Sequence, residues 1–409
     1  MEPVTTVRIL RLASGGDGVG KLPDGKTVFV PRTAPGDLVA LAGVREHKRF
    51  ARARLQRLIE ASPDRVEPRC PHYVSDECGG CQLQHIGYEA QLLSRRTFVG
   101  DAIRRLGKRE IPDPPIVPAA KRYDYRTKLT LHVGPGGGAI GLHRYGRPDQ
   151  VFDLEWCHIT APELMELWRT IRALRPFLPS HLVQVVLRLD RSGGRHVVIR
   201  VGAGEAWSGF DRLRSELARR GAAATIWYQP ENGAARAVAG AAEAFPATVF
   251  EQVNPEMGDQ VRAFALEQIG DVSGERVWDL YAGIGETTAG LITRGATVES
   301  VELDRRAVAE AEARGPAARR HTGRVEDLLR ELHPPDAVIA NPPRTGMDER
   351  VCRELNRLAP RRLVYISCDP ATLARDLQRL ERFRLSLVQA FDLFPQTTHV
   401  ETVAVLEPV

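Results

Sequence analysis

Cysteines are the residues of this 409-residue chain whose spacing most directly suggests chemistry. Cys70, Cys78 and Cys81 fall within twelve positions, and Cys157 lies further along. The N-terminus carries no secretory signal, so a metal site is favoured over a disulfide framework. Four thiolates suit either zinc or a 4Fe-4S cluster. The histidines that could replace a thiolate, if the metal is zinc, are His72, His85 and His158.

A second group of residues predicts a nucleotide-binding turn. Residues 277–285 (VWDLYAGIG) form an apolar strand that runs into a turn containing Gly283 and Gly285. Glycines there let a ligand approach the backbone. Glu302 ends the next predicted strand, where its carboxylate can accept hydrogen bonds from ribose hydroxyls. Thr288 stands at the third glycine position of the dinucleotide fingerprint, so a methyltransferase is favoured over a nicotinamide enzyme.

Two side chains near the C-terminus are candidates for catalysis. Cys368 lies in the segment SCDP, which predicts a loop beyond the carboxyl end of a strand, where active sites of α/β domains lie. Glu401 lies in the apolar segment HVETVAVL, and a buried carboxylate costs free energy unless it has a role. The alternative for Glu401 is a strand-edge residue facing water. Cys352, in a predicted helix, reads as a buried structural thiol.

The periodicity of the chain divides it into the segments that must position these residues. Residues 1–60 alternate apolar and polar side chains between glycine-rich turns, which predicts a small β-barrel. Residues 61–245 combine strand-like runs with helices over 161–174 and 207–220, an α+β pattern. Residues 246–409 alternate strands and helices, which predicts a parallel sheet with helices on both faces, a Rossmann-like α/β domain.

Charge is unevenly distributed along the chain. The net charge is +5, and residues 1–70 hold 13 Lys or Arg against 8 Asp or Glu. Such a basic segment is typical of phosphate binding, although a solvated charged face would read the same way. The chain has no apolar stretch long enough to span a membrane and no export signal, so we expect a cytoplasmic monomer. The clustered basic residues are Arg45, Lys48, Arg49, Arg52, Arg54 and Arg57.

Four segments carry a resemblance to known families. GGDGVGKLPDGKTVFVPRTAPGD (15–37) resembles the TRAM domain, an OB-like barrel, and implies contact with RNA. FEQVN (250–254), NPPRTG (341–346) and YISCDPATLARD (365–376) resemble, in order, the signatures of the RNA 5-methyluridine methyltransferases. Together with the class I methyltransferase turn at 279–285, the resemblance covers essentially the whole chain. It implies a barrel, a middle domain with an iron–sulfur site, and a C-terminal methyltransferase domain.

The resemblance also implies roles for individual residues. Gln252, Tyr281, Glu302 and Asn341 match positions that contact S-adenosylmethionine, Cys368 matches the nucleophile, and Glu401 the base. Many relatives have Asp where Asn341 stands, so its contacts are expected to be neutral hydrogen bonds. Cys157, in DLEWCHI, matches the fourth ligand of the iron–sulfur members, which favours the 4Fe-4S cluster over zinc.

The expected chemistry explains these residue types. Uracil C5 is a poor nucleophile, but addition of a Cys368 thiolate to C6 makes an enolate whose C5 can attack the sulfonium methyl. The thiol must therefore have a lowered pKa or a nearby base, and Arg344 is a candidate for lowering it. Glu401 would then remove the C5 proton so that the cysteine can leave.

Several alternatives stay open from the sequence. Methylation of C5 of a cytidine uses the same adduct, and the RNA could be transfer RNA, although the iron–sulfur resemblance favours 23S rRNA. A non-catalytic RNA-binding protein is disfavoured because Cys368, Glu401 and the glycine turn are all present. A radical enzyme is disfavoured because its CxxxCxxC triad is absent.

Overall fold

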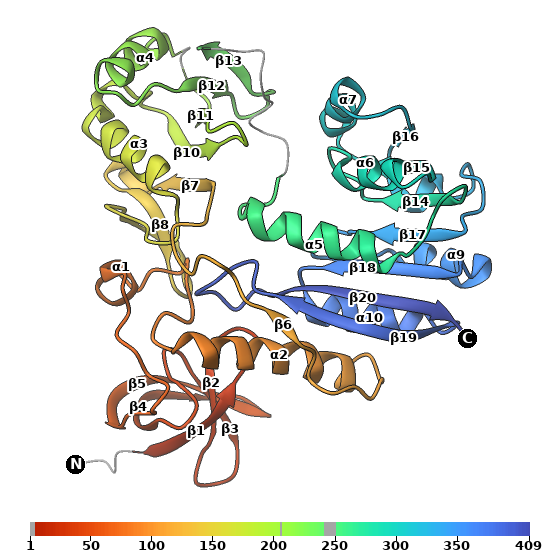
Figure 1. The fold of residues 1–409 in the computed structure, drawn as a ribbon. Helices are drawn as coiled ribbons and strands as arrows, with labels where there is room; N and C mark the ends of the chain where they lie inside the picture. The colour runs from red at the N-terminus through yellow and green to blue at the C-terminus, as the bar shows by residue number, and fades with distance from the viewer. Residues whose placement is uncertain (1–4, 205–206, 241–250) are drawn as a thin grey trace.

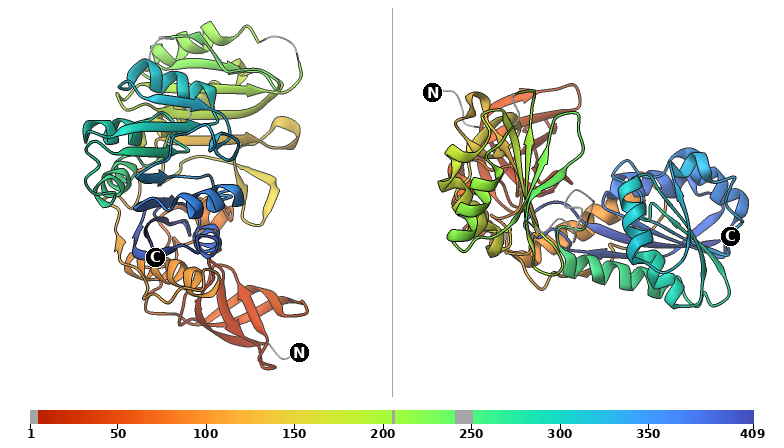
Figure 2. Two further views of the ribbon diagram at one scale, coloured as in Figure 1. Left: turned by 90° about the vertical axis from the view of Figure 1, so that its right-hand side faces the viewer. Right: turned by 90° about the horizontal axis from the view of Figure 1, so that it is seen from above.

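A computed structural model describes residues 5–204, 207–240 and 251–409. The chain forms a small barrel, a central sheet and a larger C-terminal sheet (Figure 1). The central and C-terminal parts form two lobes when the molecule is viewed from above (Figure 2). None of the helices in these ranges combines the length and the apolar character that a membrane span requires.

The N-terminal strands close into a five-stranded barrel in the order β1-β2-β3-β5-β4. Alternate residues such as Val7, Ile9, Val28 and Val30 point inward and are buried, as a period of two requires. The barrel predicted for this segment is confirmed, and the basic residues of β4 and β5 lie exposed on its outside. The strands are β1 (Thr6–Leu12), β2 (Gly18–Lys21), β3 (Thr27–Val30), β4 (Leu38–Glu46) and β5 (Phe50–Glu60).

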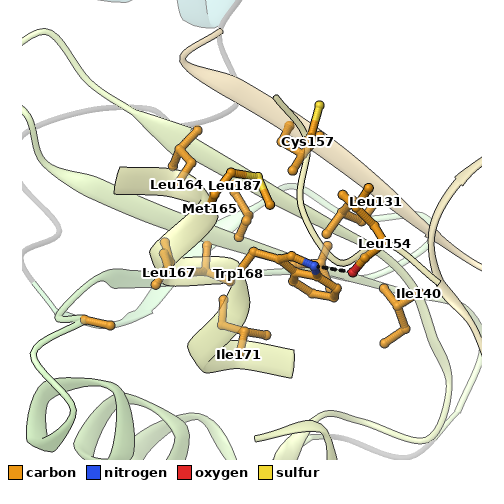
Figure 3. Close-up of a cluster of buried hydrophobic side chains, with 14 of the residues drawn as sticks. Leu131, Ile140, Leu154, Cys157, Leu164, Met165, Leu167, Trp168, Ile171 and Leu187 are labelled. Atoms are coloured by element: carbon orange, nitrogen blue, oxygen red, sulfur yellow. Dashed lines mark hydrogen bonds between the residues drawn. The ribbon is translucent and has the colours of Figure 1, made fainter. Parts of the chain in front are cut away.

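The central part is a seven-stranded sheet in the order β13-β12-β11-β10-β7-β8-β9. Helices α3 and α4 cover the face that is turned away from the C-terminal lobe (Figures 1 and 2). Trp168 of α3 is fully buried in that core and donates a hydrogen bond from Nε1 to the carbonyl oxygen of Leu154, 2.9 Å away (Figure 3). Cys157 lies at the edge of this cluster. The elements are α1 (Pro71–Ser75), β7 (Lys128–Val133), β8 (Ile140–Arg144), β9 (Arg147–Asp153), α3 (Pro162–Ala173), β10 (Leu182–Leu189), β11 (Arg195–Val201), α4 (Phe210–Arg219), β12 (Thr225–Gln229) and β13 (Arg236–Ala239), with short 3-10 turns at Pro135–Gly137 and Arg175–Phe177.

The C-terminal part is an eight-stranded sheet in the order β16-β15-β14-β17-β18-β20-β19-β6. The chain moves outward from β14 to β16 and returns to β17, so the strand order reverses between β14 and β17, where α/β domains bind ligands. The predicted parallel sheet is found, with β20 antiparallel between β18 and β19. The elements are α5 (Pro255–Gln268), β14 (Arg276–Leu280), α6 (Glu286–Thr293), β15 (Thr297–Glu302), α7 (Arg305–Arg314), β16 (Arg319–Thr322), α8 (Val325–Leu328), β17 (Ala337–Ala340), α9 (Glu349–Leu358), β18 (Arg362–Ser367), α10 (Pro370–Arg379), β19 (Phe383–Phe391) and β20 (Glu401–Pro408).

The segment between the barrel and the central sheet lies against the C-terminal sheet. Helix α2 (Tyr88–Arg105) runs between the barrel and that sheet (Figure 1), and β6 (Ile116–Val117) pairs with the edge strand β19. Tyr88 donates a hydrogen bond to Asp392 Oδ2 over 2.7 Å. The predicted segment 61–245 thus contributes to both sheets, and its boundary with 246–409 lies outside the described residues.

Candidate active site

The glycine turn after β14 has the backbone geometry that its residues predict. Tyr281, Gly283 and Gly285 have positive φ angles of 63°, 56° and 80°. The φ of Gly285 favours glycine, and a β-carbon there would also make a tight contact, 3.2 Å, with that of Ala311. Glu302, at the end of β15, accepts hydrogen bonds from the backbone N–H of Gly283 and of Asp304, each 2.8 Å long. Each carboxylate oxygen keeps a second lone pair, which a ribose hydroxyl can use.

Asp279 and Thr288 form a buried pair beneath this turn. Thr288 Oγ1 donates to Asp279 Oδ2 over 2.5 Å, and both side chains are inaccessible to solvent. Burial raises the pKa of Asp279 to about 7, against the hydrogen bonds from Thr288 that lower it. Thr288, which stands in place of the third glycine, therefore has a structural role: it donates the hydrogen bond that the buried Asp279 carboxyl needs. Sequence reasoning missed this contact, although Asp279 lies in the motif.

One large cavity joins the turn to the two candidate catalytic residues. Its volume is about 1080 Å³, and it opens at the carboxyl ends of β14, β17 and β18. Asn254, from the FEQVN segment, accepts from the Met257 N–H and begins α5. Phe250 of that segment lies outside the described residues. The six residues predicted to bind cofactor or catalyse all line this cavity: Gln252, Tyr281, Glu302, Asn341, Cys368 and Glu401.

The register of the sheet makes Cys368 and Glu401 neighbours. Ser367 of β18 pairs with Thr402 of β20 in antiparallel register, so the next residues on the two strands are Cys368 and Glu401. Asp369 caps α10 by accepting from the N–H groups of Ala371 and Thr372, which leaves Cys368 between a strand and a helix N-terminus. The predicted loop position of Cys368 is therefore found.

Glu401 is buried and not on a water-facing edge. Its side chain is 2% exposed, and Oε2 has no hydrogen-bond partner in the described part of the chain. Burial raises the pKa of Glu401 to about 8, and Arg344 opposes this rise. An unpaired, buried carboxyl whose pKa lies near neutrality is typical of an acid–base group.

The groups around Cys368 shift the pKa of its thiol in opposite directions. Burial raises the pKa of the Cys368 thiol, the charge of Glu401 raises it further, and Arg344 lowers it. Arg344 acts in the predicted direction, but its effect is smaller than that of burial. The sequence left two routes to the thiolate, a lowered pKa or a nearby base. Because burial outweighs Arg344 and the pKa is raised in the site without substrate, a base that takes the thiol proton is the route that remains.

A loop that sequence reasoning did not identify completes the cavity wall. Phe394 and His399 both line the cavity, with their rings 5.8 Å apart. His399 Nε2 lies 3.3 Å from Arg344 Nη2, and burial lowers the pKa of His399 to about 4. His399 precedes Glu401 by two residues in HVET. The sequence therefore showed that the two residues are close along the chain, but not that His399 lines the cavity.

The four cysteines of the predicted metal site line a second cavity of about 300 Å³. All four are buried, and burial raises the pKa of Cys70, Cys78 and Cys81, that of Cys78 to about 12. Thiols this far from solvent are stable as thiolates only beside a cation. Within the described ranges no three His, Cys, Asp or Glu side chains lie close enough together to hold a single metal ion.

The histidines proposed as substitute ligands for zinc are not all available. His72 accepts the Glu155 N–H at Nε2 over 3.1 Å, and its Nδ1 lies 2.8 Å from Asp76. His85 Nδ1 lies 2.6 Å from the Tyr73 hydroxyl, and His85 is not among the residues that line the cavity. His158 lines the cavity, and its Nδ1 has no hydrogen-bond partner in the described structure, so it is the candidate of the three that remains.

Comparisons with known proteins place the chain in a family. The family described as tRNA (Uracil-5-)-methyltransferase matches residues 296–409, and the TRAM domain matches residues 4–55. The fold matches that of Pyrococcus abyssi tRNA (uracil-54, C5)-methyltransferase, solved with S-adenosyl-L-homocysteine, with a TM-score of 0.73 and 24% identity over 98% of this chain and 99% of that one. The fold and the glycine turn thus define a class I methyltransferase joined to a TRAM barrel.

Relatives extend the match over the full length. A 23S rRNA (uracil(1939)-C(5))-methyltransferase, RlmD, from Thiobacillus denitrificans is 30% identical over 441 residues, covering 100% of both chains. An RlmD from Salmonella typhi is 32% identical over 99% of this chain and 96% of the relative. An uncharacterized RNA methyltransferase from Halalkalibacterium halodurans is 31% identical over 99% of this chain and 97% of the relative. The chain belongs to the family of RNA uracil-C5-methyltransferases.

Proposed function

We propose that this protein transfers a methyl group from S-adenosylmethionine to C5 of a uridine in RNA, with 23S rRNA as the substrate. The observation that carries the proposal is the adjacency of Cys368 and Glu401 in one cavity with the glycine turn. The names of the full-length relatives favour ribosomal over transfer RNA.

S-adenosylmethionine supplies an electrophilic methyl group on a sulfonium. In the proposed mechanism the Cys368 sulfur forms a bond to C6 of the uracil, and the electron pair of the C5–C6 bond moves toward O4. The electron pair then forms a bond from C5 to the methyl carbon as the bond from that carbon to the sulfonium sulfur breaks, which leaves S-adenosylhomocysteine. Glu401 removes the hydrogen from C5 as a proton, the C5–C6 double bond re-forms, and the bond from sulfur to C6 breaks.

The charges near the site support this division of roles. Arg344 lowers the pKa of both Cys368 and Glu401, so it favours the thiolate in the first step and the carboxylate in the last. Gln252, Tyr281, Glu302 and Asn341 would hold the cofactor on the other side of the cavity. In this arrangement Cys368 and Glu401 approach the uracil from the β18–β20 edge.

The proposal is tested with two variants of one pathway. Cys368→Ala should give neither 5-methyluridine nor a covalent protein–RNA complex, because C6 addition cannot occur. Glu401→Gln should still add and methylate but not eliminate, so a methylated complex should survive denaturing electrophoresis. Mass spectrometry of digested rRNA and tRNA identifies the modified base. Normal turnover by Glu401→Gln, or 5-methylcytidine as the product, would refute the assignment.

We propose further that Cys70, Cys78, Cys81 and Cys157 hold a 4Fe-4S cluster. A zinc ion needs its sulfur ligands about 2.3 Å from one point, whereas a cluster takes one thiolate on each of four irons and sets the thiols further apart. The support for the cluster is that four buried cysteines line one cavity. A cluster with four cysteine ligands and no electron transfer in methylation would have a structural role.

The cluster is tested by analysis of anaerobically purified protein. We expect iron, sulfide and a brown colour, and Cys78→Ser should lose them. Cys352→Ser is the matched control, since Cys352 is buried in α9 and should leave the iron content unchanged. Colourless protein with one zinc would refute the proposal.

The barrel is proposed to bind RNA phosphates. Its support is the exposed set of basic side chains on β4, on β5 and in the turn between them. Replacing Arg45 and Lys48 by Gln should reduce the salt dependence of RNA binding without changing the modified nucleotide. An altered modification site with an unchanged salt dependence would argue against phosphate binding.

A further inference from the structure

A row of polar side chains crosses the central sheet on the face opposite α3 and α4. Leu131, Val185 and Ile199 point into the core beneath the helices, so their strand neighbours point the other way. Gln184 of β10 pairs in register with His132 of β7 and with Arg200 of β11. Gln184 is hydrogen-bonded to both of them, over 3.2 Å to His132 Nδ1 and 3.0 Å from Arg200 Nη1. This face of the sheet is turned toward the C-terminal lobe (Figure 2).

Three cations on this face lack the carboxylates that usually accompany buried charges. Lys128, Arg200 and Arg126 are half-buried, and within the described structure none of them lies within 4 Å of a carboxylate oxygen. In the described structure the Arg200 guanidinium donates to the amide oxygens of Gln184 and Gln229, over 3.0 and 2.8 Å. The Nε of Arg126 is buried with no partner in the described chain. We call Arg126, Lys128 and Arg200 the cationic patch.

The charges of the patch act on one another. Burial lowers the pKa of Lys128, and the charges of Arg188, Arg200 and Arg126 lower it further. Arg188 is balanced by Glu251, whose Oε2 lies 2.5 Å from its guanidinium. Within the described residues the other cations have no such carboxylate. Arg126 and Lys128 line the cysteine cavity, where the thiolates of the proposed cluster would offset part of their charge, whereas Arg200 does not line it. Like charges that are gathered with too little counter-charge are destabilising, so the arrangement of Arg200 near Lys128 favours a further anionic ligand.

The patch is continuous with the catalytic cavity. Arg126 lines both the catalytic cavity and the cysteine cavity, and Lys128 lines the latter. Thr127, between them, donates its backbone N–H to the Val253 carbonyl over 2.8 Å, and Val253 also lines both cavities. An anionic chain whose reacting base lies at Cys368 would therefore leave the catalytic cavity across the patch.

We propose that the cationic patch binds the phosphodiester backbone of the RNA that flanks the target nucleotide. The proposal rests on RNA being the substrate. Guanidinium and ammonium groups bind phosphate oxygens by charge-assisted hydrogen bonds, which fix the register of the strand without reading its sequence. Gln184, which is itself hydrogen-bonded to His132, accepts from Arg200 on one side and Gln229 accepts on the other, so the guanidinium is positioned before the RNA arrives.

The test compares RNA binding by patch variants and a matched control. Lys128→Gln and Arg200→Gln each remove one charge from the patch. Arg169→Gln removes one from α3 on the opposite side of the sheet, where Arg169 is exposed and pairs only with Glu166 in the described structure. Binding of an oligouridylate of about 20 nucleotides is measured by fluorescence anisotropy from about 50 to 200 mM salt.

Each patch variant should lower the slope of log K against log salt by about 0.7, which is about a fivefold loss of affinity at 0.1 M salt. Lys128→Arg should keep the wild-type slope, and Arg169→Gln should match the wild type. Affinity for S-adenosylhomocysteine should be unchanged in all four, which shows that the C-terminal domain is intact. Equal slopes for Lys128→Gln, Arg169→Gln and wild type would overturn the proposal.

A measurement on the unaltered protein guards against misfolded variants. RNA containing 4-thiouridine next to the target should cross-link to peptides from β7 and β11. Cross-links confined to the barrel would overturn the proposal. Failure of the wild type to form 5-methyluridine is a separate outcome: it would refute the proposed function, whereas unchanged slopes in a methylating enzyme refute only the patch.

Discussion

The substitution Glu401→Gln should stabilise the protein, and increasingly so as the pH rises. Burial raises the pKa of Glu401 from 4.5 to about 8. Between these two pH values the folded state holds a proton that the unfolded state has released, so the free energy of unfolding falls as the pH rises. Each pH unit in this window costs about 1.4 kcal/mol. The loss is therefore about 3 kcal/mol at pH 7 and about 5 kcal/mol above pH 8.

Glutamine has the same shape and no charge, so the variant escapes this loss. Hydrogen exchange of peptides from β18 and β20 reports the local free energy of opening. Comparing variant and wild type at one pH cancels the intrinsic exchange rate. We expect little difference at pH 5, protection about 100-fold higher in the variant at pH 7, and a larger gain at pH 9.

Glu407 provides the control, because it lies on the same strand but has partners. Its carboxylate lies 2.7 Å from Arg362 and 2.6 Å from Arg384. Glu407→Gln removes these ion pairs and should not stabilise the strand at any pH. The reasoning fails if Glu401→Gln is no more stable than the wild type at pH 9, or if the difference does not grow with pH. A buried carboxyl that destabilises its own domain is the outcome expected if Glu401 has the proposed role.

Three further substitutions test the remaining parts of the site. Gly285→Ala should weaken binding of S-adenosylhomocysteine about tenfold or more by calorimetry, because φ is 80° and Ala311 is close; unchanged affinity would contradict the role of the turn. Thr288→Val should lower the free energy of unfolding in urea by about 1–3 kcal/mol, because buried Asp279 loses its donor; equal stability would count against the pair. Cys352→Ala should cost about 1 kcal/mol and leave methylation unchanged, because this thiol is buried in a helix; loss of methylation would reopen the choice of nucleophile.

Patterns over short stretches of the sequence predicted individual strands, helices and turns. The alternation of strands and helices predicted the C-terminal sheet, and the turn at Gly283 and Gly285 predicted the nucleotide end of the cavity. The helices predicted over 161–174 and 207–220 are α3 and α4, each slightly shorter in the structure. These features depend on residues close together in sequence.

Long-range pairing was not accessible in the same way. Cys368 and Glu401 become neighbours through the antiparallel register of β18 and β20. The motifs of the sequence do not specify this register. Helix α2 has an apolar face, but nothing in that face says which sheet it covers. The sequence also could not decide between a lowered pKa of Cys368 and a nearby base, because burial is a property of the assembled cavity.

The connection between the cysteine loop and the catalytic loop shows why some contacts cannot be read from residue types. The backbone N–H groups of Gln82 and Leu83, which follow Cys81, both donate to the carbonyl oxygen of Gln396, over 3.1 and 3.0 Å. Gln396 is held at a φ of 70° and lies in the loop that leads through His399 to Glu401. Because backbone groups make these bonds, any sequence could form them, and only the fold brings them together. A cluster that ordered the cysteine loop would support the catalytic loop through these bonds, without any electron reaching the methyl group.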